Sequence, residues 1–151
     1  MHKKTLSIAE SCTGGLLGHL ITQAPGCSKY FMGGLITYGD ETKTSKLGIP
    51  RASLTKHGVV SEYTASLMAK RVRRLFRTDF GIGITGITGP DGGSRKKPVG
   101  LVYIAASTPQ RTFCKKYQFK GVRSEIKTSA AHEALKLLRR EFGSPLLRND
   151  S

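Results

Sequence analysis

The chain has no tryptophan, few cysteines, few acidic residues and no long hydrophobic run. Its three cysteines, Cys12, Cys27 and Cys114, have unrelated spacings, which excludes a disulfide framework and a zinc-ligand pattern. No apolar stretch approaches the roughly 20 residues that span a bilayer, and the run after the basic residues 2–4 is too short for a signal peptide. We therefore expect a cytoplasmic protein with no membrane partner, no metal and no cofactor.

The scarcity of acidic residues leaves a large positive charge. Ten Asp and Glu stand against 25 Lys and Arg, so the formal net charge is +15. The basic residues form separate clusters near 70–77, 95–97, 115–116 and 139–140, and no zinc finger or RNP-type aromatic motif accompanies them. Nucleic-acid binding is therefore not favoured. Attraction for a phosphorylated small molecule and a solvated basic surface both remain open.

What is present indicates one α/β domain. A chain of 151 residues suits one core. Apolar runs predict strands, and stripes with helical spacing predict helices. Ser61 is the expected cap of the helix whose inward stripe is Ala65, Met68, Val72, Leu75 and Phe76, and Asp40 or Thr42 is the expected cap of a shorter helix. In the last helix we expect Ile126, Ala130, Ala134, Leu137 and Leu138 to face inward. The glycines of the third strand leave little side-chain bulk, so we expect this strand to be central in the sheet and closely approached by its neighbours. The lysines of the fifth strand indicate a place near an edge of the sheet. The expected strands are 6–9, 34–38, 80–84, 99–106 and 112–119, and the expected helices begin near 16, 40, 61 and 123.

The order of these elements predicts the architecture. Strands and helices alternate in the first half, and two strands follow one another in the second half. This pattern favours a three-layer α/β/α sandwich with a mixed, mostly parallel five-stranded sheet. After the last helix, which is expected to end at Phe142, residues 143–151 form a short polar tail.

Three segments carry side chains suited to chemistry. Residues 9–15 place Glu10, Ser11 and Cys12 on a turn between a strand and a helix, where a nucleophile and backbone N–H donors meet. A helix cap is the simpler structural alternative for such a turn. Tyr38 ends a second strand and Lys43 lies five residues after it, where a desolvated lysine can act as a base, although spacing alone favours an ordinary surface lysine.

The third segment is the glycine-rich loop 85–94, which follows a strand, as ligand-binding loops of open α/β sheets do. It matches neither GxGxxG nor a Walker A motif. A plain connection between strands is the alternative. Three of the four histidines, His19, His57 and His132, have no arrangement that serves Ser11, and we expect them to be structural or exposed, with His57 in a loop.

Taken together, four segments resemble the CinA C-terminal domain family of competence- and damage-inducible proteins. They read AESCTGG at 9–15, GLITY at 34–38 with Lys43 beyond it, GVVSE at 58–62, and TGITGPDGG at 85–93 followed by KPVG at 97–100. They occur in the family's order and cover about 6–142. Gly39 and Asp40 stand where the family usually has Ser-Asn.

The resemblance implies a single amidohydrolase domain over 1–151. It implies conversion of nicotinamide mononucleotide to nicotinate mononucleotide and ammonia, without a cofactor, in a homo-oligomer. Ser11 is then the nucleophile, Lys43 the general base, and Tyr38 assists the proton transfer or holds Lys43. The implied substrate-binding residues are Cys12, Thr13 and Gly14 at the oxyanion, Thr85, Gly86 and Gly89 in the glycine loop, and Arg123 for the phosphate.

Two other functions remain open at this stage. One is a non-catalytic module that binds nucleotides or nucleic acid through the same crevice and the basic surface. The other is a serine amidase of the same mechanism that acts on a different ribotide.

Overall fold

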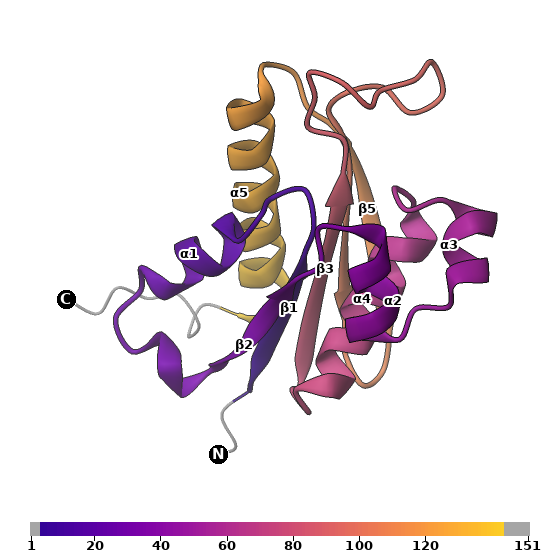
Figure 1. The fold of residues 1–151 in the computed structure, drawn as a ribbon. Coiled ribbons are helices and arrows are strands. Elements are labelled where there is room, and N and C mark those ends of the chain that lie inside the picture. The colour runs from indigo at the N-terminus through magenta and orange to yellow at the C-terminus, as the bar shows by residue number, and fades with distance from the viewer. Residues whose placement is uncertain (1–3, 144–151) are drawn as a thin grey trace.

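The described strands form one sheet. The computed structural model describes residues 4–143, and its five strands have the order β2-β1-β3-β4-β5 (Figure 1). β1 pairs in parallel with β2 and β3, whereas β4 is antiparallel to both β3 and β5. Four strands therefore run in one direction and β4 is reversed, which confirms the mixed, mostly parallel sheet. The bounds are β1 Leu6–Glu10, β2 Phe31–Ile36, β3 Phe80–Gly86, β4 Leu101–Ser107 and β5 Thr112–Gln118.

Helices cover both faces of the sheet, as the sequence predicts. α1 (Leu16–Thr22) and α5 (Arg123–Phe142) contact each other and share the larger hydrophobic core with the sheet. α4 (Glu62–Leu75) covers the other face, with α2 (Asp40–Leu47) and α3 (Arg51–His57) beside it. Figure 1 shows α1 and α5 on one side of the strands and α2, α3 and α4 on the other. A short 3-10 turn, η1 (Cys27–Lys29), precedes β2.

The central strand β3 carries glycines because α4 packs directly against it. A Cβ on Gly81 would overlap the backbone oxygen of Ala69, and a Cβ on Gly83 would overlap that of Ala65. β3 therefore lies in the middle of the sheet and is closely approached, as its glycines predict.

The helix predictions hold best where the amphipathic pattern is long. Ser61 caps α4, because its hydroxyl accepts the N–H of Thr64 at 3.1 Å. Of the predicted inward stripe of α4, Leu75 is the exception: it is 56% exposed because the helix ends there. α5 has the predicted bounds, and its expected inward residues are all buried, namely Ile126, Ala130, Ala134, Leu137 and Leu138.

Three local predictions near the site are wrong. β2 begins at Phe31, three residues before the predicted start, and ends at Ile36, because its pairing with β1 covers these residues. Tyr38 therefore lies in the loop that follows β2. α3 is an additional helix, so His57 ends a helix instead of lying in a loop. The residue that caps α2 is Gly39, not Asp40 or Thr42. The predicted tail beyond Gly143 falls outside the described residues.

Candidate functional site

Ser11 lies at the carboxyl end of β1, on a tight turn that leads into α1. Its backbone N–H donates to the carbonyl of Ile84 in β3 at 3.1 Å, and its own carbonyl accepts the N–H of Gly14 at 3.0 Å. Gly14 and Gly15 have φ of +59° and +104°, conformations that residues with a Cβ rarely adopt. The two glycines therefore let the chain reverse just behind Ser11.

The carboxylate of Glu10 occupies the N-terminus of α1 from inside the protein. It accepts the hydroxyl of Thr13 at 2.6 Å and the backbone N–H groups of Leu17 and Gly18 at 2.9 and 3.0 Å. Glu10 is buried, at 2% exposure. The sequence suggested that these helix donors face a bound anion or oxyanion. That suggestion is wrong for α1, because the chain supplies the anion itself.

Lys43 is buried against Ser11, although it comes from α2. Its Nζ lies 3.2 Å from Ser11 Oγ and donates to the carbonyl oxygens of Thr37 at 2.8 Å and Tyr38 at 3.3 Å. A neutral amine has two N–H bonds and one lone pair. The two carbonyls can accept the two N–H bonds, which leaves the lone pair for the hydroxyl proton of Ser11. The arrangement is that of a base and a nucleophile.

Two opposing effects act on the pKa of Lys43. Burial lowers it, because the charged ammonium loses hydration. The carboxylate of Asp40 acts in the other direction, with Oδ1 3.7 Å from Nζ. Burial is the larger effect, so the pKa of Lys43 lies below its usual value and favours the basic amine form.

Cys12 is a poor competitor for the role of nucleophile. Burial raises the pKa of its thiol to about 12, so the reactive thiolate is scarce at neutral pH. The thiol lies close to Gly86 at the end of β3, where a Cβ would come within 3.1 Å of its sulfur.

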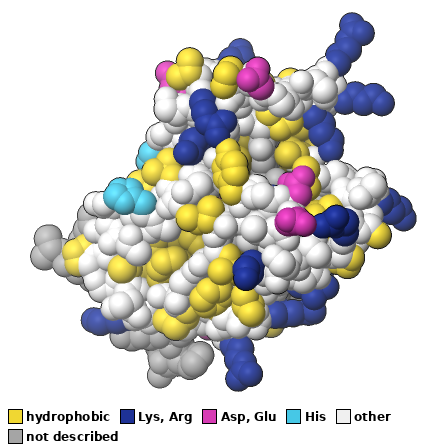
Figure 2. Space-filling view, in the orientation of Figure 1, with side chains coloured by type: hydrophobic (Ala, Val, Ile, Leu, Met, Phe, Trp, Pro, Cys, Tyr) yellow, Lys and Arg dark blue, Asp and Glu magenta, His cyan; other side chains and the backbone are white. Residues whose placement is uncertain are grey.

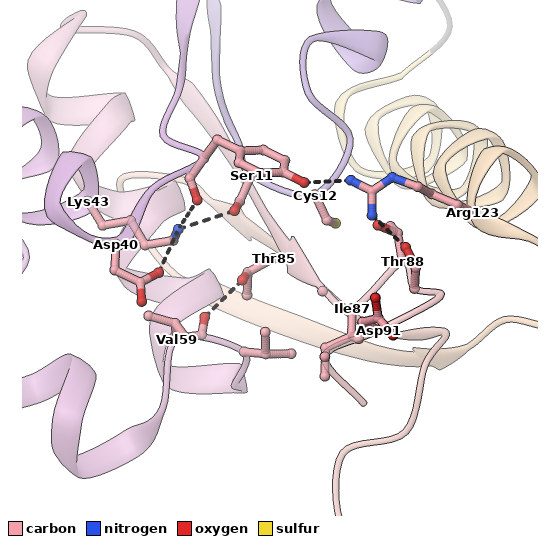
Figure 3. Close-up of a pocket in the computed structure, with 15 residues that line it drawn as sticks. Ser11, Cys12, Asp40, Lys43, Val59, Thr85, Ile87, Thr88, Asp91 and Arg123 are labelled. Carbon is pink, nitrogen blue, oxygen red and sulfur yellow. Dashed lines mark hydrogen bonds and ion pairs between the residues drawn. The ribbon is translucent and has the colours of Figure 1, made fainter. Parts of the chain in front are cut away.

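A pocket of about 250 Å³ opens beside Ser11 and Lys43. Figure 3 shows both side chains at one end of it, with Asp40 beside Lys43 and Arg123 reaching in from α5. Eight of the ten predicted site residues line this pocket: Ser11, Cys12, Tyr38, Lys43, Thr85, Gly86, Gly89 and Arg123. Thr13 and Gly14 do not, because the Thr13 hydroxyl is bound to Glu10 and the Gly14 N–H to Ser11.

Tyr38 and Arg123 form a bridge across the pocket. The guanidinium of Arg123 donates to the Tyr38 hydroxyl and to the carbonyl of Gly89, both at 2.6 Å. Tyr38 therefore holds Lys43 through its backbone carbonyl, while its phenol lies on Arg123. Neither partner of Arg123 is a carboxylate, so these contacts leave its positive charge unneutralised.

The glycine loop begins at a fixed point. Thr85 is buried at the end of β3, and its hydroxyl donates to the carbonyl of Val59 at 2.8 Å. Gly86 has no space for a side chain, since a Cβ would lie 2.7 Å from Val102. These contacts tie the loop to the segment before α4 and define one wall of the pocket.

The sequence reasoning missed several residues of the site. Asp40 and Asp91 line the pocket, together with the backbone around Val59. Lys127 lies one helical turn beyond Arg123, with its Nζ over Gly14, 3.6 Å from the point where a Cβ would stand. The spacing of Asp40 and Lys43, three residues apart on a predicted helix, is the one signal that indicated a pair. The others depend on tertiary contacts.

The described residues match neither the pattern of a metal site nor that of a membrane-spanning helix. Within 4–143, no three His, Cys, Asp or Glu side chains cluster in a way that would hold a metal ion, and no helix is long and apolar enough to cross a membrane. Lys and Arg side chains are spread over the visible face and do not gather in one block (Figure 2).

Comparisons with known proteins show the family to which the chain belongs. The family model of the CinA C-terminal domain matches residues 1–142. CinA-like proteins of Gemmatimonas aurantiaca and Syntrophus aciditrophicus are 48% and 46% identical over 94% and 91% of this chain, but these matches cover 33% of each relative. The crystal structure of the competence/damage inducible protein CihA from Agrobacterium tumefaciens is 36% identical, with a TM-score of 0.88 over 91% of this chain and 84% of that one. The chain spans about a third of the length of the curated relatives it matches.

Proposed function

Because the chain belongs to the CinA C-terminal domain family, we propose that it is an amidohydrolase that converts nicotinamide mononucleotide to nicotinate mononucleotide and ammonia. The observation that carries the proposal is the buried Lys43 amine 3.2 Å from Ser11 Oγ, held by two carbonyl oxygens. A binding module has no need for a desolvated lysine beside a serine, whereas a serine amidase needs a base within hydrogen-bond reach of its nucleophile.

In the first half of the proposed reaction, Ser11 Oγ attacks the carboxamide carbon and its proton passes to Lys43 Nζ. Negative charge then develops on the amide oxygen. Of the three turn residues expected at the oxyanion, Cys12 is the one that lines the pocket, and we assign the oxyanion to its backbone N–H. The Lys43 ammonium returns the proton to the nitrogen of the amide, the C–N bond breaks, and ammonia leaves an ester on Ser11.

In the second half, water attacks the ester carbon and Lys43 accepts a proton from it. The C–O bond to Ser11 breaks, and Lys43 returns the proton to Ser11 Oγ. The product is a carboxylic acid, which releases its proton to solvent and becomes a carboxylate; the hydrolysis involves no change of oxidation state. Lys43 thus alternates twice between amine and ammonium, which suits a lysine with a lowered pKa.

We assign the phosphate end of the substrate to Arg123. Its guanidinium lies on the pocket wall at the first residue of α5 and makes its two hydrogen bonds to uncharged acceptors. A helix N-terminus adds to the attraction for an anion. Thr85, Gly86 and Gly89 would then contact the middle of the nucleotide.

The test is ammonia release from nicotinamide mononucleotide by Ser11→Ala and Lys43→Met. Each is expected to lower the rate by about 10²-fold or more, with an unchanged circular dichroism spectrum. Lys46→Met is the matched control, because Lys46 lies on the same helix and is exposed. Near-full activity of Ser11→Ala would refute the nucleophile assignment.

The substrate assignment has its own comparison. Nicotinamide mononucleotide, the riboside and free nicotinamide are assayed side by side. Equal rates on these three compounds would refute the phosphate role of Arg123. If a different ribotide, assayed in the same way, reacts faster than nicotinamide mononucleotide, this result would support the alternative of a serine amidase that acts on that ribotide.

A further inference from the structure

Asp40 holds a special place beside the reactive pair. It is the first residue of α2, and its carboxylate lies 3.7 Å from Lys43 Nζ. The side chain of Lys43 is 2% exposed, whereas that of Asp40 is 69% exposed. Asp40 also lines a second pocket of about 440 Å³ between α2 and α3, so it stands where this pocket and the Ser11 pocket adjoin. Asp40 is therefore a solvent-exposed carboxylate that contacts the buried amine of Lys43.

The other groups around Lys43 carry no charge that replaces this contact. Two backbone carbonyls and the Ser11 hydroxyl contact its Nζ, and the nearby Cys12 thiol stays protonated because burial raises its pKa. The buried carboxylate of Glu10 is directed to the N-terminus of α1. Within residues 4–143, Asp40 is the carboxylate that pairs with Lys43.

From this geometry we propose that Asp40 is a positioning residue for the base: it stabilises the ammonium form of Lys43 between the two proton transfers and thereby sets the pH at which the amine becomes available. The inference rests on the proposed function, since it assigns work to the Ser11–Lys43 pair. Asp40 is assigned no contact with the substrate or with Ser11 and acts only through Lys43.

The consequence for pH dependence has a definite sign. The rate should rise with pH as Lys43 loses its proton. Asp40 favours the protonated form, so its removal lets Lys43 lose the proton at lower pH, and the acidic limb of the rate profile moves to lower pH. The same change destabilises the ammonium that forms during attack, so the plateau rate falls. For an exposed carboxylate we expect a fall of about two- to fivefold.

The experiment compares Asp40→Asn with Glu41→Gln in pH–rate profiles of ammonia release. Glu41 is the matched control, because it lies next to Asp40 on the same helix turn, has the same charge, and pairs with Arg51 at 3.2 Å. Asp40→Asn should show both the shifted limb and the lower plateau, Glu41→Gln neither, and Asp40→Glu should restore part of the plateau. An unshifted limb in Asp40→Asn, or an equal shift in Glu41→Gln, would overturn the proposal.

A second readout does not depend on activity. The titration of the Lys43 side chain is followed by NMR of the protein with labelled lysine, with the signal assigned by its loss in Lys43→Met. Its pKa should be lower in Asp40→Asn than in the parent chain and unchanged in Glu41→Gln. If ammonia release fails altogether, the proposed function falls, and the NMR titration still decides whether Asp40 controls Lys43.

Discussion

At the scale of single residues, the site depends on two buried ionisable side chains with opposite tasks. Glu10 is held by three donors and stabilises the turn that carries Ser11. Lys43 is held by carbonyl oxygens and contacts the Ser11 hydroxyl. The hydrogen bonds of Glu10 compensate for burial of its carboxylate, whereas the environment of Lys43 favours loss of its charge.

The role of Glu10 leads to a prediction for Glu10→Gln. An amide keeps one acceptor oxygen but turns an NH₂ group toward the buried donors of Leu17, Gly18 or Thr13. We expect a loss of about 1–3 kcal/mol in the free energy of unfolding, the typical cost of a buried unsatisfied polar group. Urea unfolding measures it, with Glu41→Gln as an exposed control. Equal stability of the two variants would show that Glu10 does not stabilise α1.

At the scale of the elements, the contact of α4 with β3 brings together two segments that line the pocket, namely the segment before α4 and the end of β3. The segment before α4 supplies Val59, whose carbonyl accepts the Thr85 hydroxyl at the end of β3. Ser61 then starts the helix, and the glycines of β3 let it lie close to the sheet. The position of Thr85 in the pocket therefore depends on Gly81 and Gly83, which lie earlier in the same strand and do not line the pocket.

This dependence predicts the effect of Gly83→Ala. The added Cβ would overlap Ala65 O and stand 2.8 Å from Met68 Cβ, so α4 would be pushed from the sheet. We expect a loss of about 1–3 kcal/mol in unfolding free energy. Gly39→Ala is the control, since a Cβ there meets nothing within 4 Å and φ is −76°; it should cost less than about 1 kcal/mol, because glycine is the better helix cap. Chemical denaturation of both variants decides, and a larger loss in Gly39→Ala would contradict the packing argument.

Element boundaries show where sequence reasoning succeeds and fails. α5 could be predicted to the residue, because a 20-residue helix repeats its apolar pattern many times. β2 and α3 could not. β2 is an edge strand with glycines at two of its six positions, and α3 has only seven residues. In both elements the apolar pattern repeats too few times to define where the element begins and ends.

At the scale of the whole molecule, the net charge is +15, and on the face that Figure 2 shows the Lys and Arg side chains do not gather in one block. On the pocket wall the positive charge of Arg123 is accompanied by the carboxylates of Asp40 and Asp91, so most of the net positive charge lies in the rest of the molecule. Lys127 stands one turn further along α5, over the turn behind Ser11. A field of this sign attracts anions to the site from a distance. The homo-oligomer and the single amidohydrolase domain over 1–151 stay predictions.

The charge predicts a salt effect that depends on the substrate. When ionic strength rises from about 0.01 M to about 0.15 M, the Debye length falls from about 30 Å to about 8 Å. The kcat/KM for nicotinamide mononucleotide should then fall by about two- to tenfold. The kcat/KM for free nicotinamide should change little, because this substrate carries no charge. Steady-state assays at both salt concentrations measure this, and an equal dependence for both substrates would contradict it.

The same salt series tests the alternative of a nucleic-acid-binding module. Tight binding to a random oligonucleotide that weakens steeply with salt, without ammonia release, would support that alternative. Weak binding with no such slope would leave the charge to small anions.

The sequence by itself determined the α/β class, the order of the elements and the segments that carry chemistry, because apolar periods, glycines and polar turns are local properties of the chain. Only the tertiary structure decided which side chains meet. It placed Lys43 on Ser11, turned the Tyr38 phenol to Arg123, and set Asp40 beside the base. It also closed the N-terminus of α1 with Glu10. Such contacts join residues from separate elements, and they depend on the register of strands and the packing of helices, which no local pattern specifies.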